Sequence, residues 1–401
     1  MIFKTLSPAP PDAIMGLTEA FKKDPNPQKI NLGVGVYQDD TGVTPIMECV
    51  KEAERRILVS EKTKSYLSIG GAPEYRAHMQ KLMFGVDHPV LRDDRARTAH
   101  TPGGTGALRI GALFLKQVCP EATVWMSTPT WANHPGIFTA TGYKQAAYPY
   151  YCAETQGLDY EAMRDALKKV PAGDVVLMHV CCHNPSGIDL SDEQWREIAG
   201  IAADRGWIPF LDFAYQGLGD DLERDRVGLL RMAEAVPELF VAHSCSKNFG
   251  LYRERTGSLT VMASTTSAAE PAFSHVEKTV RVTYSNPPAH GGLIVTTILD
   301  DAALRGQWEQ EVVGIRDRIK GVRTALVRKL AEQGVARDFS FIERQRGMFS
   351  FSGLTDEQVA FLREKKSIYI VKGGRINVAG ITSANIDYLC ESIAEVLKPE
   401  P

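Results

Sequence analysis

Two sequence patterns that would direct a protein to or through a membrane are missing. No run of about 18 apolar residues is present to cross a bilayer. The first residues, MIFKTLSPAPPDAIMG, have neither the apolar centre of a signal peptide nor the arginine content of a transit peptide. We therefore expect no association with a membrane and a cytoplasmic location.

Cysteine is scarce, and its spacing is unsuited to cross-links. The chain has seven cysteines, an odd number, none of them in a Cys-x-x-Cys motif, and Cys181 and Cys182 are adjacent. This spacing is typical neither of a disulfide framework nor of a zinc site. We expect reduced thiols and no bound metal.

An excess of positive charge is also missing. Lysine and arginine total 46 against 49 aspartate and glutamate residues, which gives a formal net charge of -3. No basic stripe is apparent for a phosphate backbone to contact, so we do not expect nucleic acid as a partner. No Gly-x-Gly-x-x-Gly motif follows an expected strand, which disfavours a nicotinamide-dependent dehydrogenase.

What the sequence does contain is the ordinary composition of a soluble protein. Its 401 residues, 44% hydrophobic and 24% charged, suffice for two or three domains with a buried core. The clearest unit is an apolar run over residues 175–180, followed by a helix that opens at Ser191 and stops at Gly206. A strand over residues 208–211 comes next, and this strand, helix, strand order predicts a parallel pair.

Two further short apolar runs, residues 239–242 and 258–262, extend the predicted sheet, with helices expected on both faces. Ligands of such sheets bind beyond the carboxyl ends of the strands. We therefore expect the site to be formed by the segments that follow the predicted strands, residues 181–187, 212–215 and 244–247.

The last hundred residues follow a different pattern. Helical periodicity over residues 355–365 and 386–397 alternates with short strands. Within the second helix an apolar stripe marks the face expected to meet a core, formed by Ile386, Leu389, Cys390, Ile393 and Leu397. A second, smaller α+β domain is predicted here.

Two charged residues stand at the ends of expected strands. Asp212, in FLDFAY, either caps the following turn or pairs with a ring nitrogen of a bound heterocycle, since a buried carboxylate is costly without a cation. Lys247, in SCSKNFG, is either an ordinary exposed lysine or an amine that loses its proton in a pocket and forms a Schiff base. Arg255 is a candidate neighbour of that amine or a phosphate clamp.

Two loop motifs have both a functional and an ordinary structural interpretation. The small residues of PGGTGALR, residues 102–109, precede a helix predicted over residues 107–116. They either cradle a phosphate with backbone N–H groups or form a simple glycine-rich turn. Asn184, kept out of the helical region by the proline that follows it, either points into a site or forms an Asn-Pro turn.

Three large side chains are ambiguous in the same way. Trp131 either stacks on a flat ring or fills the core. Arg281 and Arg375 either grip a carboxylate through two parallel hydrogen bonds or lie on the surface.

Taken together and in order, six motifs resemble those of the class I aminotransferases, specifically the aspartate/aromatic branch. They are GGTGALR, CCHNPSG, DFAYQG, SKNFGLY, YSNPPAHG and GRINVAG, and the match covers nearly the whole chain. The resemblance implies a fold type I α/β architecture, with helices around a mostly parallel central sheet and a smaller α+β domain. It also implies pyridoxal 5′-phosphate and a homodimer with shared active sites. The implied regions are an N-terminal arm (1–11), a small domain (12–44 and 311–401) and a large cofactor-binding domain (45–310).

The resemblance assigns catalytic and cofactor-binding roles to residues of this chain. Lys247 would hold the cofactor as an imine and move a proton at the substrate, while Asp212 would keep the ring nitrogen protonated. Tyr215, the third catalytic residue, and Asn184 would hydrogen-bond the phenolic oxygen. The remaining contacts would be Trp131 on the ring and, at the phosphate, Gly103, Gly104, Thr105, Ser244, Arg255 and Tyr66 of the partner subunit. Behind Asp212, His134 and His179 would form a supporting layer, or else be core histidines with satisfied hydrogen bonds.

The same resemblance assigns the substrate contacts. Arg375 would bind the α-carboxylate, and Arg281 of the partner subunit the distal carboxylate. Gly35, Trp131 and Asn184 would also line the substrate site. The implied reaction exchanges an amino group between L-aspartate or glutamate and 2-oxoglutarate or oxaloacetate, in a ping-pong cycle between the aldehyde and amine forms of the cofactor.

The side chain of the preferred amino-acid substrate is less fully specified. Thr105 and Asn286 follow the aspartate-preferring pattern, in which aromatic-preferring relatives often carry serine. Gln38 and Ser65 match neither pattern, and Cys245 stands where tyrosine or phenylalanine is common. An aromatic-amino-acid aminotransferase is therefore the alternative.

Two other classes share part of this pattern. A pyridoxal-phosphate lyase or decarboxylase would need Lys247 and Asp212 but no second arginine for a distal carboxylate. A non-catalytic ligand sensor with an aminotransferase-like domain carries a helix-turn-helix segment ahead of it, whereas only about a dozen residues precede the domain here.

Overall fold

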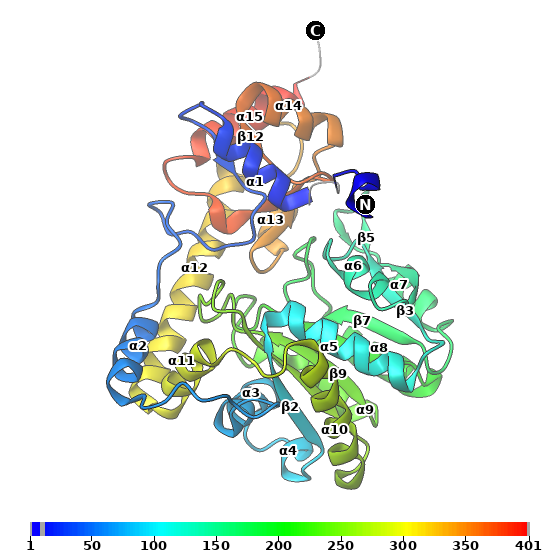
Figure 1. Ribbon diagram of the computed structural model, residues 1–401. Helices are drawn as coiled ribbons and strands as arrows, with labels where there is room; N and C mark the ends of the chain where they lie inside the picture. Colours follow the sequence, from blue (N-terminus) through cyan, green and yellow to red (C-terminus); the bar gives the residue numbers. More distant parts are fainter. Residues whose placement is uncertain (1, 9–12, 399–401) are drawn as a thin grey trace. The chain divides into compact units, whose positions relative to one another are not determined.

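The computed structural model describes residues 2–8 and 13–398 (Figure 1). Of the predicted N-terminal arm, residues 1 and 9–11 therefore lie outside the described part. The chain divides into two compact units, of which unit 1 comprises Met1–Thr44, Gly321–Glu343 and Met348–Pro401 and unit 2 comprises Pro45–Lys320 and Arg344–Gly347. The boundary between Lys320 and Gly321 lies inside one continuous helix, α12 (Ala302–Glu332).

Unit 2 is built on a seven-stranded sheet in the order β2-β10-β9-β8-β7-β3-β4. The neighbours from β9 to β4 pair in parallel, and β10 pairs antiparallel with both β9 and β2. The strands are β2 (Ala96–Pro102), β3 (Thr123–Thr128), β4 (Lys144–Pro149), β7 (Val175–His179), β8 (Ile208–Phe213), β9 (Leu239–Ser244) and β10 (Thr256–Met262). A separate two-stranded ladder joins β5 (Tyr151–Cys152) and β6 (Gly157–Leu158).

Helices surround this sheet (Figure 1). The helices of unit 2 are α2 (Glu48–Ser60), α3 (Pro73–Phe84), α4 (Pro89–Arg92), α5 (Gly103–Val118), α6 (His134–Thr139), α7 (Tyr160–Leu167), α8 (Asp192–Arg205), η2 (Arg224–Arg226), α9 (Val227–Ala235), α10 (Thr266–Thr283), α11 (Ala289–Asp300) and the first part of α12. The mixed α/β class and the mostly parallel central sheet confirm the predicted fold class.

Helix α8 illustrates how local sequence sets an element's ends. The side chain of Ser191 accepts a hydrogen bond from the backbone of Gln194, whose own side chain bonds back to Ser191. This reciprocal cap satisfies two of the N–H groups left open at a helix start. Gly206 ends the helix in the left-handed conformation, which glycine adopts without steric strain. The predicted helix and its parallel flanking strands, β7 and β8, are confirmed.

Helix α5 begins earlier than the sequence predicted. It starts at Gly103, with φ of 71°, and not at residue 107. Glycine weakens helical propensity, so the sequence hid the first turn of the helix. The glycine-rich motif is therefore the amino-terminal turn of α5 itself, which leaves its backbone N–H groups at the edge of the sheet.

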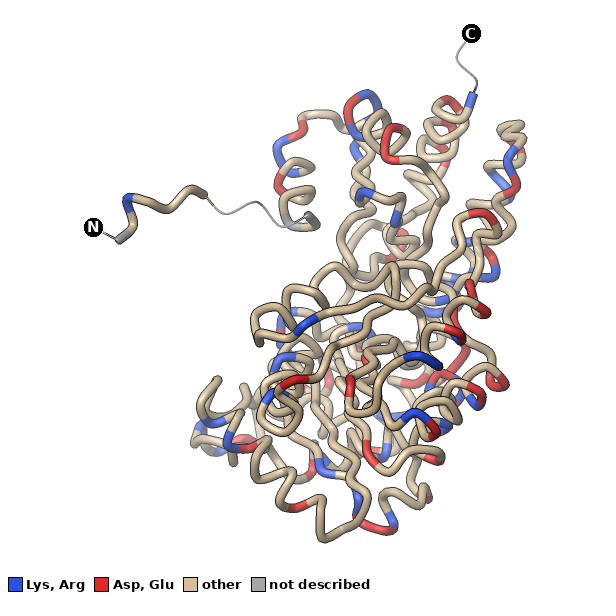
Figure 2. The backbone as a smooth tube through the Cα atoms, turned by 90° about the vertical axis from the view of Figure 1, so that its right-hand side faces the viewer, with Lys and Arg blue, Asp and Glu red and all other residues tan. Residues whose placement is uncertain are grey.

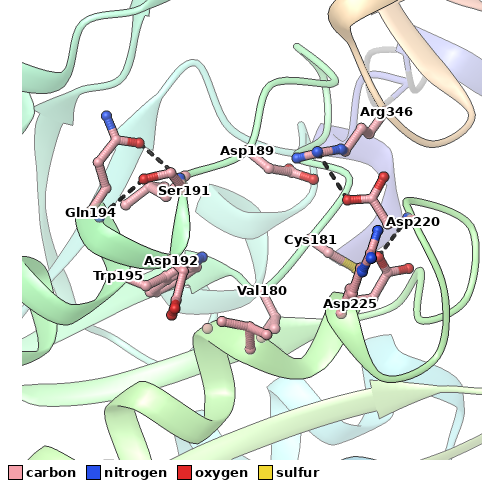
Figure 3. A pocket seen from close by; sticks show the side chains of 14 residues that line it. Val180, Cys181, Asp189, Ser191, Asp192, Gln194, Trp195, Asp220, Asp225 and Arg346 are labelled. Carbon is pink, nitrogen blue, oxygen red and sulfur yellow. Dashed lines mark hydrogen bonds and ion pairs between the residues drawn. The ribbon is translucent and has the colours of Figure 1, made fainter.

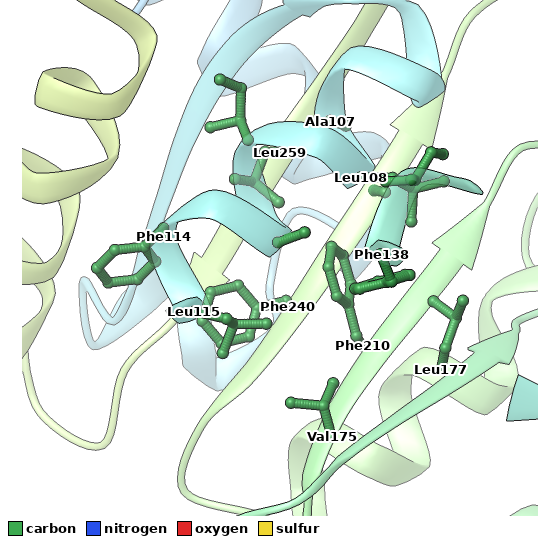
Figure 4. Close-up of a cluster of buried hydrophobic side chains, with 14 of the residues drawn as sticks. Ala107, Leu108, Phe114, Leu115, Phe138, Val175, Leu177, Phe210, Phe240 and Leu259 are labelled. Atoms are coloured by element: carbon green, nitrogen blue, oxygen red, sulfur yellow. The ribbon is translucent and has the colours of Figure 1, made fainter. Parts of the chain in front are cut away.

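One large hydrophobic cluster fixes α5 on the sheet (Figure 4). Leu108 and Leu115 of α5 pack among side chains from neighbouring strands, including Leu177, Phe210 and Leu259. All five residues are at most 2% exposed. Burying each such side chain contributes about 1.5–3 kcal/mol, so the amino terminus of α5 is held firmly against the strand ends.

Unit 1 contains two small ladders and its own core. Strand β1 (Ile30–Asn31) pairs in parallel with β12 (Ile368–Tyr369), and β11 (Phe349–Phe351) pairs antiparallel with β13 (Arg375–Asn377). Its helical elements are η1 (Ile2–Thr5), α1 (Ala13–Lys23), the end of α12, α13 (Phe341–Arg344, of which Arg344 falls in unit 2), α14 (Asp356–Lys366), η3 (Val378–Gly380) and α15 (Ile386–Leu397). The two helices predicted here, α14 and α15, are confirmed, and Leu389 and Ile393 of α15 lie in the core of the unit.

Expectations about membrane-spanning helices, cysteines and charge concern the described residues as a whole. Among them, no helix is long and apolar enough to cross a membrane. All seven cysteines lie in the described part of the chain and carry thiols, not disulfides. Charged residues of both signs are interspersed along the chain (Figure 2).

Candidate active site

The carboxyl ends of three neighbouring parallel strands carry the predicted polar residues. Asn184 follows β7, Asp212 and Tyr215 lie at and beyond the end of β8, and Lys247 follows β9. Because β7, β8 and β9 are adjacent and parallel, their ends meet at one edge of the sheet. The structure thus brings these four predicted residues together.

Asp212 is a buried carboxylate with cationic and hydrogen-bonding neighbours. It is 5% exposed, and its Oδ2 lies 3.0 Å from Nε2 of His134 and 3.9 Å from Nε2 of His179. Burial raises the pKa of Asp212, but the hydrogen bond from His134 and nearby positive charge, including that of Lys247, outweigh it and leave the pKa below its usual value. Asp212 is therefore an anion inside the protein.

Lys247 lies in the turn after β9, partly buried above an aromatic ring. Its Nζ is 4.9 Å from the centroid of the Tyr215 ring. Burial lowers the pKa of Lys247 to about 8, with Arg255 acting in the same direction and Asp212 opposing it. A neutral amine is consequently accessible near physiological pH, which is the state required for nucleophilic attack on a carbonyl carbon.

Tyr215 and Asn184 form a second polar pair next to the lysine. The side-chain amide of Asn184 donates to the Tyr215 hydroxyl over 3.3 Å, and both side chains are buried. The peptide bond between Asn184 and Pro185 is cis. The pair offers an amide and a phenol as hydrogen-bond donors beside Lys247.

The first turn of α5 offers hydrogen-bond donors suited to an anion. Its N-cap, Pro102, provides no side-chain cap, so the first N–H groups, including that of Thr105, are open to a ligand. A Cβ on Gly103 would lie 2.7 Å from the Arg255 guanidinium, and one on Gly104 would lie 3.2 Å from Cβ of Ser244. The absence of these side chains leaves backbone amides, a hydroxyl and a guanidinium around one space, which is a donor set typical of phosphate sites.

Comparison with known proteins agrees with this geometry. The family described as "Aminotransferase class I and II" matches residues 27–393. The chain is 52% identical to an aspartate aminotransferase of Haemophilus influenzae over 99% of this chain and 100% of the relative. The chain belongs to the class I and II aminotransferases. The predicted family and enzyme class are thereby confirmed.

Solved structures of other aminotransferases have the same fold. An aromatic-amino-acid aminotransferase from Burkholderia pseudomallei, covalently bound to pyridoxal phosphate, superposes with a TM-score of 0.97 at 44% identity, covering 99% of this chain and 100% of that one. The cytoplasmic aspartate aminotransferase of Saccharomyces cerevisiae has a TM-score of 0.97 at 36% identity, covering 99% and 98%. Aspartate and aromatic enzymes thus both occur among the relatives of this aminotransferase.

Trp131 of the aminotransferase lies beside His134, the histidine that contacts Asp212. Its ring meets that of His134 edge-on, with 5.2 Å between centroids, and it packs partly against the large hydrophobic cluster. The two interpretations given for Trp131, core packing and a place at the site, are therefore compatible.

Arg375 of the aminotransferase is a buried cation in unit 1. It is 5% exposed, donates from Nη2 to the carbonyl oxygen of Gly33, and lies 4.5 Å above the ring of Phe349. Gly35 belongs to the same group, since a Cβ there would meet the Phe349 ring at 2.7 Å. The surface interpretation of Arg375 is wrong, because the guanidinium is enclosed by backbone and ring.

Tyr66 and Arg281 of the aminotransferase lie on the surface of unit 2. Tyr66 is 91% exposed, and Arg281 is exposed and donates to Oγ of Ser285 over 2.6 Å. Within the single chain both side chains are accessible to a second molecule.

His183 of the aminotransferase has a supporting role that the sequence did not reveal. Its ring stacks on Tyr150 with 3.9 Å between centroids and meets His179 edge-on at 4.7 Å. Its two nitrogens lie 3.0 Å from Oγ of Ser127 and 2.7 Å from Oγ of Ser186. His183 therefore supports the histidines behind Asp212, and its position next to Asn184 was the only signal for this in the sequence.

Proposed function

We propose that this aminotransferase exchanges an amino group between L-aspartate or glutamate and 2-oxoglutarate or oxaloacetate in a ping-pong cycle, with Lys247 as the residue that holds the cofactor. The cofactor is pyridoxal phosphate, as the family and its cofactor-bound relative indicate. One observation carries the assignment of the site: an amine of lowered pKa and an anionic carboxylate, Lys247 and Asp212, lie at the ends of adjacent strands.

The residues of the site fit this cofactor group by group. The open N–H groups of α5, with Ser244 and Arg255, match a phosphate dianion. Asp212 matches a protonated ring nitrogen, because its carboxylate is buried, charged and held by a hydrogen bond with His134. Lys247 supplies the amine that an aldehyde requires. We assign the phosphate to Gly103, Gly104, Thr105, Ser244 and Arg255, and the flat face of the ring to Trp131.

The catalytic roles follow from the states of the side chains. When bound, pyridoxal phosphate supplies a cationic ring that accepts the electron pair left on the substrate Cα. Asp212 keeps a proton on the ring nitrogen, since its own pKa is too low to take that proton back. Lys247, once its amine is released, would remove the proton from the substrate Cα and deliver it to C4′ of the cofactor, a transfer that contributes about 10²–10⁴-fold. Tyr215 and Asn184 hold the phenolic oxygen by hydrogen bonds.

Binding of the substrate is assigned to arginines. Arg375 takes the α-carboxylate, and its buried, ring-supported guanidinium is pre-organised to bind both carboxylate oxygens. Arg281 of the partner subunit takes the distal carboxylate, and the Gly35 backbone lines the entrance beside Phe349. The preference for aspartate is supported by Thr105 and Asn286 and by the 52% identical relative of that name.

A homodimer follows from these assignments. Tyr66 and Arg281 are exposed in the single chain, and apolar side chains near them in sequence are exposed too, among them Leu58 at 83%, Val59 at 84% and Val282 at 79%. Exposed apolar side chains of this size favour a protein interface. We propose that both residues act in the active site of the partner subunit and that the dimer is cytoplasmic. Sedimentation of the purified holoenzyme as a monomer would contradict the shared site.

The deciding experiment is a comparison of amino donors. Steady-state rates are measured with aspartate, glutamate, tyrosine and phenylalanine against 2-oxoglutarate. We expect the highest kcat/KM with aspartate, and an Arg281→Ala variant that loses activity selectively with dicarboxylates. A higher kcat/KM for tyrosine or phenylalanine would favour the alternative, an aromatic-amino-acid aminotransferase. An unchanged rate of Arg281→Ala with aspartate would contradict the role of Arg281.

A further inference from the structure

One polar cavity of unit 2 has no part in the proposed reaction (Figure 3). It has a volume of about 430 Å³ and lies where the segment after β7 meets the loop between β8 and α9. Its polar lining is formed mainly by Cys181, Asp189, Asp220, Asp225 and Arg346. Of the lining residues four are aspartates and two are arginines, so the cavity favours a cation.

Cys181 lines this cavity, and the thiol of its neighbour Cys182 lies close to that of Cys181. Adjacent side chains of an extended chain point to opposite faces. Here the strand has ended at His179, and Cys182 adopts a left-handed conformation with φ of 52°, uncommon for a residue with a side chain. The thiols of Cys181 and Cys182 interact directly as a result, and both residues are buried.

A carboxylate from a distant part of the chain completes the group. One oxygen of Asp225 lies with the two sulfur atoms so that all three are within 4.8 Å of one another. Asp225 is itself held in place by the backbone N–H groups of Gly217, Gly219 and Asp220, at 2.8 to 2.9 Å. A carboxylate has about four lone-pair positions. These three bonds use two positions on Oδ2 and one on Oδ1, which leaves one position on Oδ1 for a ligand.

We propose that Cys181, Cys182 and Asp225 bind one thiophilic divalent cation of the zinc class, with water from the cavity as the fourth ligand. Ligand atoms of a tetrahedral zinc lie about 3.5–3.8 Å apart, so small side-chain rotations close the observed spacing. Each thiol gives up its proton to solvent as its sulfur bonds to the cation, and no electrons are transferred. Soft sulfur ligands select such a metal over magnesium or calcium.

Occupancy of this site would connect two segments that serve the active site. The turn with Cys181 and Cys182 continues into Asn184, and the backbone N–H groups of Cys182 and His183 are fixed by Asp189 at 2.8 and 2.9 Å. The loop that positions Asp225 begins directly after Tyr215. A bound cation therefore ties the segment that carries Asn184 to the segment that follows its partner Tyr215.

Cadmium, which shares the thiolate preference of zinc, is the probe for the test. Holoenzyme freed of metal by a chelator is titrated with Cd²⁺, and binding is followed by calorimetry and by the ultraviolet charge-transfer band of cadmium thiolates. We expect one cadmium per chain with this band. Cys181→Ser and Cys182→Ser should each weaken binding by at least about tenfold, a loss seen even for residues that only support a metal ligand. Cys152→Ser, outside the cavity, should bind as the unmodified chain does.

A second measurement does not depend on the variants folding. In the unmodified holoenzyme, cadmium should protect Cys181 and Cys182 from alkylation, as read by peptide mass spectrometry, and leave Cys152 reactive. Unchanged alkylation of the pair, or unchanged binding by Cys181→Ser, would overturn the proposal. So would binding without the thiolate band, which is the result expected if the cation were held instead by His134, His179 and Asp212.

Discussion

Lys247 in unit 2 and Arg375 in unit 1 are both cations withdrawn from solvent, yet their surroundings differ in kind. Lys247 stands above an aromatic ring near an anionic carboxylate, and burial lowers its pKa to about 8. Arg375 is enclosed by the carbonyl oxygen of Gly33 and the ring of Phe349. A guanidinium keeps its proton in proteins, whereas an ammonium group gives it up readily when buried.

These different surroundings suit the two basic side chains to different roles. A residue that forms an imine and moves protons must change its charge, and the surroundings of Lys247 permit that change. A residue that binds a carboxylate must keep its charge and hold its donor groups in a fixed orientation. The surroundings of Arg375 meet both requirements. Each of the following substitutions or conditions alters one side of this contrast.

The largest effect is expected from removing the amine that changes its charge. Lys247→Ala should lower kcat for transamination by about 10⁴-fold, the upper end for a lost proton-transfer group. The measurement is the rate with aspartate and 2-oxoglutarate. Lys144→Ala, at an exposed position of β4, is the matched control and should keep full activity. Loss of less than tenfold in Lys247→Ala would show that another residue moves the proton.

A smaller but still large effect is expected at the carboxylate that faces the lysine. Asp212→Asn should reduce kcat by about 10³-fold, because removing one member of a buried charge pair leaves about 3–5 kcal/mol of uncompensated charge. The control is Asp174→Asn, at another mostly buried aspartate, which bonds Trp125 at the opposite end of β7. We expect this control to lose stability in thermal unfolding but to retain kcat.

Acidification should slow capture of the cofactor by about 100-fold. Only the neutral amine attacks an aldehyde, and with a pKa of about 8 the neutral fraction of Lys247 falls by about that factor between pH 9 and pH 6. The rate is read from the visible band that appears when pyridoxal phosphate is added to the cofactor-free chain. A rate that rises only above pH 10 would mean that burial does not lower this pKa.

The lowered pKa of Lys247 also makes the free energy of unfolding depend on pH. The folded pKa of Lys247 lies below its usual 10.5, so the charged form is disfavoured in the folded state. The free energy of unfolding of the cofactor-free chain should therefore increase from pH 8 to pH 10.5 relative to Lys247→Ala. It should lose this contribution as the pH falls through about 8.

The smallest effect is expected from exchanging the permanent cation. Arg375→Lys keeps the charge but loses the fork and the contact with the Phe349 ring, so about 1.5–3 kcal/mol of binding should be lost. KM should rise by about 10–100-fold for every amino acid tested, since all carry an α-carboxylate, with a smaller change in kcat. Arg328→Lys, on the exposed surface of α12, is the control. A selective loss with dicarboxylates would move the role of Arg375 to the distal group.

Much of unit 2 could be predicted because its signals are local. The cap at Ser191, the stop at Gly206 and the apolar runs on either side determine β7, α8 and β8 with little tertiary information. The positions of Asn184, Asp212 and Lys247 followed from one rule about strand ends. The direction of β10 could not be predicted from the sequence, because a short apolar run is typical of parallel and antiparallel strands alike.

The remaining features depend on residues far apart in the chain. The boundary at Lys320 lies within a continuous helix, where no break in the pattern marks it. Cys181 and Cys182 lacked a familiar metal spacing because their third neighbour, Asp225, comes from another loop. The interaction of His183 with Ser127 arises only when β3 and β7 lie side by side.

The most direct test of the contrast between the two cations is to identify the lysine that holds the cofactor. Holoenzyme is reduced with borohydride, digested, and analysed by mass spectrometry for a pyridoxyl group. We predict a single modified residue, Lys247, in every chain. Modification of a different lysine, with the Lys247 peptide recovered unmodified, would contradict the assignment of the active site.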